Sequence, residues 1–224
     1  YMNGETNLRF GATEIYGEDF TQGSAKAHMD EGIFSLDKFN ILRGDGTEGF
    51  SARGSISRGY ATDIEVLGSG FNLRTMDHTE QLPVDVSGKL SLHGVVGGTL
   101  FEPEPRGTLT LTASTIAENP IDNSYVEFNT TNGDLKFHGS LIGSTMSVNG
   151  KIHLWEKQDY RLIAAFQKFP VHSIYPNAVD GSPIRATLTG GLRLQGHIGE
   201  KPGPVDLNLV ANEVNFSWDG HLFT

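Results

Sequence analysis

Apolar and polar residues alternate with a period of two along most of this chain. In residues 205–209 three apolar side chains are separated by Asp206 and Asn208. Successive side chains of a β-strand point to opposite faces of the sheet, so each such segment has one apolar and one polar side. Residues 161–168 are the best candidate for a helix, and they fit a strand about as well. The pattern predicts an all-β protein.

Turn-forming residues punctuate these alternating segments about every 8 to 12 residues. They are Gly-Asp-Gly at 44–46, Asn-Gly-Asp at 132–134, Asn-Gly at 149–150, and Asp-Gly at 180–181 and 219–220. Asn-Gly and Asp-Gly supply the positive φ angles of tight hairpins. Glycine is abundant, at 28 of 224 residues, as many strands joined by tight turns require. We therefore expect sequence neighbours to pair in a long antiparallel meander with few crossovers.

Composition excludes several classes of function. The formal net charge is −10, which argues against a nucleic-acid surface because such a surface needs clustered Lys and Arg. The chain has no cysteine, so thiolate zinc sites, thiol catalysis and disulfides are absent. No run approaches the roughly 18 apolar residues of a membrane-spanning helix.

Catalytic and metal-binding motifs are not visible in the sequence. The eight histidines are scattered, with no His-x-His or His-Glu-x-x-His pairing, and His93 and His138 occupy predicted polar-face positions. No G-x-S-x-G elbow, phosphate loop or dinucleotide fingerprint occurs. We therefore predict a binding or conduit module that is not an enzyme, with no catalytic residue, no metal and no cofactor.

Two segments recur about a hundred residues apart. GKLSLHG at 88–94 matches GGLRLQG at 190–196, which begins 102 residues later. GSISRGYATDIEVL at 54–67 parallels GKIHLWEKQDYRLI at 150–163, which begins 96 residues later. Repeats that stack on their neighbours bury a face that no single copy could bury.

The repeat suggests how the chain is organised. We expect residues 1–224 to form a single continuous β module with approximate repeat units 32–130 and 131–224. The chain opens at Tyr1 and stops within an alternating pattern at Thr224, so we expect it to be a fragment of a longer chain.

The order of strands and turns in these repeats resembles the sequence pattern of a known family. GKLSLHG at 88–94 is followed by a Pro-bearing turn and then by GTLTL at 107–111, and Gly-Ser-Ile56 and Gly-Lys-Ile152 each follow a turn and a strand. This pattern of strands and turns, from about residue 32 to residue 223, resembles the repetitive β region of the TamB family and its AsmA-like relatives.

The resemblance implies a fold, a location and partners. It implies an elongated antiparallel sheet curled into an open trough, or β-taco, with an apolar interior. It also implies a periplasmic protein whose full-length form is anchored in the inner membrane, with a BamA- or TamA-like outer-membrane partner. Such proteins are thought to carry phospholipid between the two membranes or to support outer-membrane biogenesis.

The apolar face itself is the predicted functional element, as a groove that shields phospholipid acyl chains. Its candidate lining residues are Phe39, Ile41, Ile64, Val66, Phe71, Leu90, Leu92, Leu109, Leu111, Phe128, Leu135, Phe137, Met146, Val148, Leu192, Leu194, Leu207, Leu209, Phe216 and Trp218. Burying an acyl chain gives about 0.8 kcal/mol per methylene, so about a dozen methylenes offer roughly 10 kcal/mol before ordering costs.

Two other interpretations fit the same pattern. The apolar residues could pack against one another in a closed barrel or sandwich, which would make the chain a structural or adhesive cell-surface module with a sealed core. A carbohydrate-active β protein would need aromatic platforms, and the chain has only Trp155 and Trp218. Strong binding of an apolar dye to the folded protein distinguishes an open groove from a sealed core.

Overall fold

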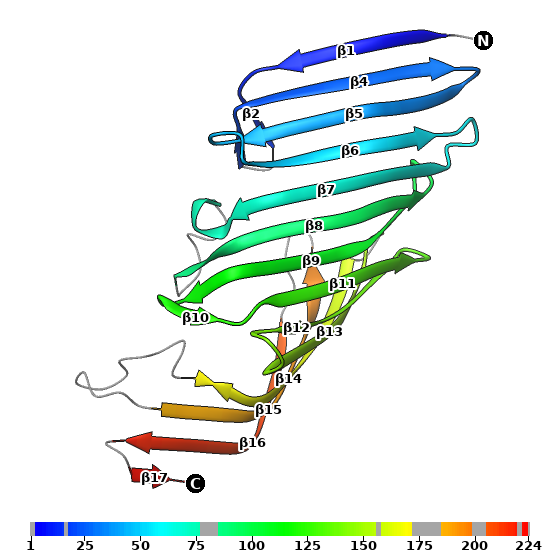
Figure 1. Cartoon of the computed structure of the whole chain (residues 1–224). Helices are drawn as coiled ribbons and strands as arrows, with labels where there is room; N and C mark the ends of the chain where they lie inside the picture. Colours follow the sequence, from blue (N-terminus) through cyan, green and yellow to red (C-terminus); the bar gives the residue numbers. More distant parts are fainter. Residues whose placement is uncertain are drawn as a thin grey trace.

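A computed structural model describes residues 3–15, 18–76, 85–155, 158–171, 185–198, 205–218 and 221–223 (Figure 1). These residues are almost entirely β-strand, which confirms the all-β class. Within those ranges, no helix is long and apolar enough to cross a lipid bilayer.

The strands follow one another along the chain with short connections. The first half contains β1 (Gly4–Phe10), β2 (Thr13–Ile15), β3 (Glu18–Phe20), β4 (Gln22–Asp30), β5 (Ile33–Arg43), β6 (Glu48–Ile56), β7 (Thr62–Asn72), the one-turn 3-10 helix η1 (Leu73–Thr75), β8 (Val86–Gly98) and β9 (Pro103–Ile116). The second half contains β10 (Asn119–Ile121), β11 (Ser124–Thr131), β12 (Asp134–Leu141), β13 (Met146–His153), β14 (Gln158–Pro170), β15 (Arg185–Ile198), β16 (Asp206–Trp218) and β17 (His221–Phe223).

One antiparallel sheet contains nearly all of these strands. It has 15 strands, ordered from β1 through β4 to β9 and then through β11 to β17, and β10 adds to β9. Sequence neighbours therefore pair along almost the whole chain, as the turn spacing predicted. The sheet is open, with β1 at one edge and β17 at the other.

The sheet is curled and is not closed into a barrel. Figure 1 shows β1 to β11 almost broadside and β12 and β13 nearly edge-on, and β14 bends back toward the broadside direction, so the strand direction turns strongly along the sheet. Among the described residues, the elements whose backbones run closest together are hydrogen-bonded neighbours, apart from β3 against β5 and η1 against β8. This confirms the predicted elongated, curled antiparallel sheet.

A small hairpin covers the N-terminal part of the sheet. Strands β2 and β3 pair only with each other, and Phe20 on β3 lies in a buried cluster with Ile41 and Phe71. An ion pair of 2.9 Å joins Glu18 on β3 to Arg43 at the end of β5, and both side chains are only 12% exposed. The hairpin is therefore held by apolar packing and by charge.

The predicted turns are partly correct. Residues 44–46 and 132–134 lie at the β5–β6 and β11–β12 connections, where Gly44, Gly46 and Gly133 have positive φ. The predicted turn at 149–150 is wrong, because both residues lie inside β13. Gly150 is opposed to Phe137 on β12, and the Phe137 ring occupies the space that a side chain at position 150 would need. Predicted turns at 180–181 and 219–220 fall outside the described residues.

The ambiguous segment and the repeated segments are all strands. Residues 161–168, which fitted a helix or a strand, belong to β14. Residues 54–67 form the hairpin between β6 and β7, and residues 150–163 fall on the paired strands β13 and β14. The matching stretches 88–94 and 190–196 lie on β8 and β15, the next strand of the meander in each case.

Candidate functional site

Pairing register shows which side chains share a face, because directly opposed residues of an antiparallel sheet lie on the same side. One row of opposed residues runs from β1 to β16 and contains only glycine, alanine and larger apolar residues. Its members are Leu8, Ala25, Phe39, Ala52, Val66, Gly94, Gly107, Phe128, Phe137, Gly150, Leu162, Leu194 and Leu207.

A second row lies beside the first on the same face. Its members are Phe10, Gly23, Ile41, Phe50, Gly68, Leu92, Leu109, Val126, Gly139, Val148, Ala164, Leu192 and Leu209. Neither row contains a polar or charged side chain. We call the side of the sheet that carries these two rows the apolar face.

The predicted lining residues fall on the apolar face wherever their side chains are described. Several belong to the two rows. Others lie two positions from a row member on the same strand, namely Ile64, Leu90, Leu111, Leu135 and Met146, and Phe71 pairs with Leu90 across a bulge. Phe216 and Trp218 lie on β16, but their side chains are outside the described residues.

Exposure differs along the apolar face. Leu109 and Phe137 are half-buried, and Val148 is 6% exposed. Near the C-terminal edge, Leu207 is 66% exposed and Leu209 is 59% exposed. The β2–β3 hairpin shields this face near β5, Val148 and Ala164 are also buried on β13 and β14, and the face is open near β16.

Aromatic rings lie over glycines of the neighbouring strand on this face. At each such glycine an added Cβ would overlap or crowd the ring of the opposed residue. The pairs are Phe10 with Gly23, Phe50 with Gly68, Phe128 with Gly107, Phe137 with Gly150, and Tyr160 with Gly196. A ring in that position lies along the sheet and does not project from it, so the surface of the apolar face is comparatively flat at these pairs.

Gly150→Ala is expected to lower the free energy of unfolding by about 1–2 kcal/mol, because the new methyl group displaces the Phe137 ring. The matched control is Gly191→Ala on β15, where an added Cβ meets only Ala164 O at 3.5 Å. The control is expected to be neutral or slightly stabilising. Urea unfolding of both variants measures this, and equal effects at the two glycines would contradict the ring placement.

Charged and polar residues occupy the opposite side, the polar face. Ion pairs link neighbouring strands there, including Lys26–Glu5 at 3.0 Å, Arg53–Glu65 at 2.7 Å and Lys151–Asp134 at 2.7 Å. Each histidine whose side chain is described has a carboxylate within 3.5 Å: His28 with Asp37, His93 with Glu65, His138 with Glu127, His153 with Asp134, and His197 with Asp159. No group of three potential metal ligands occurs in the described part of the chain.

These pairs give the fold a defined pH dependence. Hydrogen bonds from Lys151 and then His153 hold the pKa of Asp134 below its usual value. A carboxylate whose pKa is lowered by folding stabilises the fold above its unfolded pKa, and this contribution is lost as the pH falls through the lower, folded pKa. Asp134→Asn is therefore expected to destabilise the protein at pH 7, with the difference from wild type shrinking below about pH 4. Urea unfolding from pH 7 to pH 3 measures it, and a difference that is constant over this range would contradict it.

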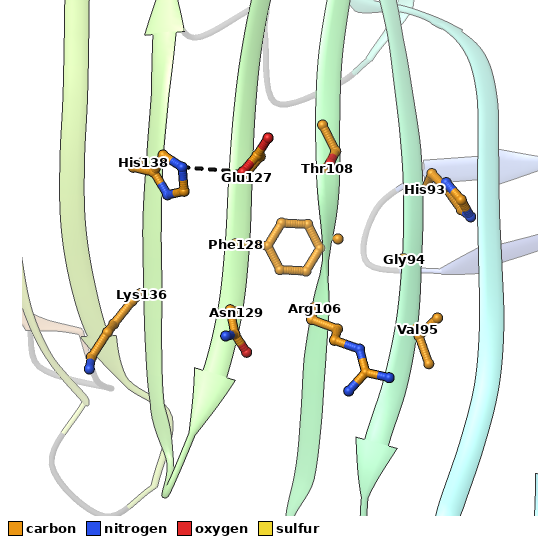
Figure 2. A pocket seen from close by; sticks show the side chains of 11 residues that line it. His93, Gly94, Val95, Arg106, Thr108, Glu127, Phe128, Asn129, Lys136 and His138 are labelled. Atoms are coloured by element: carbon orange, nitrogen blue, oxygen red, sulfur yellow. Dashed lines mark ion pairs between the residues drawn. The ribbon is translucent and has the colours of Figure 1, made fainter.

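The polar face is hollowed over β8, β9, β11 and β12 (Figure 2). The hollow measures about 610 Å³ and combines the His138–Glu127 ion pair with the cations Arg106 and Lys136. Sequence reasoning did not identify this hollow, because the residues come from four strands and meet only through the pairing register.

Comparison with known protein families, curated proteins and solved structures finds no match to this chain.

Proposed function

We propose that this chain binds the hydrocarbon chains of lipids on its apolar face. The observation that carries this proposal is the pair of register rows from β1 to β16, which contain no polar or charged side chain and are exposed near β16. Proteins seldom leave a large contiguous apolar surface open to water unless it meets a ligand or partner.

Binding would be passive and would need no specific polar contact. Each methylene moved from water to an apolar surface contributes about 0.8 kcal/mol at full burial, so a chain seated along several strands gains appreciable free energy. The rings that lie over glycines leave few obstacles, and each step along the rows resembles the next. A hydrocarbon chain could therefore move along the face against low barriers while its headgroup stays in water.

The wider setting rests on the resemblance to the TamB family. In that setting the chain would be a periplasmic segment of a bridge between inner and outer membranes and would shield phospholipid acyl chains in support of outer-membrane biogenesis. The full-length protein would be anchored in the inner membrane, and a BamA- or TamA-like protein would be its outer-membrane partner. No catalytic step is part of this proposal.

A fatty-acid binding experiment tests the proposal. The folded protein is titrated with a fluorescent fatty acid, and lipids that co-purify with it are identified by native mass spectrometry. We expect saturable uptake and co-purified phospholipid. A structural or adhesive module with a sealed core predicts neither, so the absence of both would overturn the proposal.

A further inference from the structure

A row of cations crosses the polar face in register. From β6 to β16 the directly opposed residues are Arg53, Glu65, Val95, Arg106, Asn129, Lys136, Lys151, Arg161, Gln195 and Asp206. The segment from β9 to β14 carries Arg106, Lys136, Lys151 and Arg161 around a single amide, Asn129. We call these five residues the cationic row.

The cationic row is electrostatically costly for the sheet alone. Lys136, Lys151 and Arg161 are directly opposed on three neighbouring strands, and like charges in that position destabilise a sheet. Lys151 is neutralised by Asp134 at 2.7 Å, whereas Arg106, Lys136 and Arg161 have no ion pair with a described carboxylate. In a chain with a net charge of −10, this concentration of cations indicates an anionic ligand.

The row borders the hollow described above. Figure 2 shows Arg106, Asn129 and Lys136 in line across β9, β11 and β12, all lining the hollow. A parallel line in the same view carries Thr108, Glu127 and His138. The cations at this end of the row therefore face an open depression that can admit a ligand.

The flanks of the row restrict the shape of the ligand. Glu127 lies on one side, and Asp134, which pairs with Thr131 and His153, lies on the other. A flat anionic surface such as a membrane would meet these carboxylates together with the cations. A narrow chain laid along the row would meet mainly the cations and the Asn129 amide.

The length of the row fits a short peptide. Four strand spacings of about 4.8 Å separate β9 from β14, so the row is about 19 Å long when it is followed along the curved surface of the sheet. An extended peptide rises about 3.4 Å per residue, so about six residues cover that length and present about three side chains to the row. No aromatic residue lies in the row to stack on a sugar ring.

We propose that the cationic row binds an extended acidic segment of a protein. Carboxylates of the segment would pair with Arg106, Lys136 and Arg161, which are two strand spacings, or about 9.6 Å, apart along the row. Asn129 would donate a hydrogen bond from its side-chain amide. This site lies on the face opposite the proposed hydrocarbon surface and does not depend on that proposal.

A charge-matched pair of variants tests the site. Lys136→Gln/Arg161→Gln removes two cations from the row, and Lys38→Gln/Lys89→Gln removes two exposed cations from the same face outside the row. The probe is a fluorescein-labelled peptide of eight glutamates, followed by anisotropy at low ionic strength. We expect saturable binding by the wild type, at least tenfold weaker binding by the row variant, and less than a threefold change in the control.

Several results would overturn the proposal. They are no saturable binding by the wild type, equal losses in both double variants, or row-dependent binding of phosphatidylglycerol vesicles without binding of the peptide. Relief of like-charge repulsion should leave the row variant at least as resistant to urea as the wild type. If that variant does not fold, Arg106→Gln serves instead, because its opposed residues are Val95 and Asn129, and at least threefold weaker binding is required of it.

Discussion

Leu109→Asp is expected to weaken fatty-acid binding at least tenfold, or by about 1.4 kcal/mol or more. Leu109 is opposed by Leu92 and Val126 in the middle of the apolar face. A carboxylate there must either stay hydrated, which keeps hydrocarbon away, or lose water against the ligand, which costs several kcal/mol. Titration of the folded variant with a fluorescent fatty acid measures the change.

The control for this prediction is the next residue on the same strand. Thr110→Asp introduces the same charge on the polar face, at a position that is half-buried like Leu109. We expect its fatty-acid affinity to stay within about twofold of the wild type, because the carboxylate points away from the apolar face. Equal losses of fatty-acid affinity in the two variants would mean that the added charge or a loss of protein stability weakens binding, regardless of the face on which the carboxylate lies.

Phe20→Ala is expected to lower the free energy of unfolding by about 3 kcal/mol, near the lower end of the range for removing a buried aromatic side chain. Phe20 is 5% exposed and packs with Ile41 and Phe71, so its loss leaves a cavity under the β2–β3 hairpin. Urea unfolding, with the midpoint and slope both fitted, measures the loss.

Ile15 on the same hairpin supplies the comparison. It is 41% exposed, so Ile15→Ala should cost under about 1 kcal/mol. If the two alanine variants unfold at the same urea concentration, the hairpin does not pack on the sheet as described. Because the hairpin covers part of the apolar face, Phe20→Ala should also raise the amount of apolar dye bound per molecule.

The strands and their faces could be predicted from the sequence because each follows from local alternation. An apolar side is evident from the alternating pairs alone, regardless of which strand lies next to them, as at Leu90 and Leu92 or at Leu192 and Leu194. The same local signal placed the predicted lining residues on one face wherever their side chains are described. Residues 161–168 remained ambiguous because a short apolar segment can satisfy both helical and strand periods.

Features that depend on register could not be predicted. Gly150 follows Asn149, a typical turn pair, and only its opposition to Phe137 explains why a glycine is needed within β13. The cationic row joins residues from five strands that no local pattern connects. The β2–β3 hairpin was also missed, because three-residue strands are too short to show an alternation.

Single-cysteine labelling tests most directly whether hydrocarbon lies along the apolar face, and the absence of native cysteine makes each label unique. A fluorophore is placed in turn at Leu92, Leu162 and Leu207 on the apolar face, and at His93, Arg161 and Asp206 on the polar face. A nitroxide-labelled fatty acid is then added. We expect strong quenching at the first three positions and little quenching at the three positions on the polar face. Quenching that is equal on both faces, or confined to one end of the sheet, would contradict this expectation.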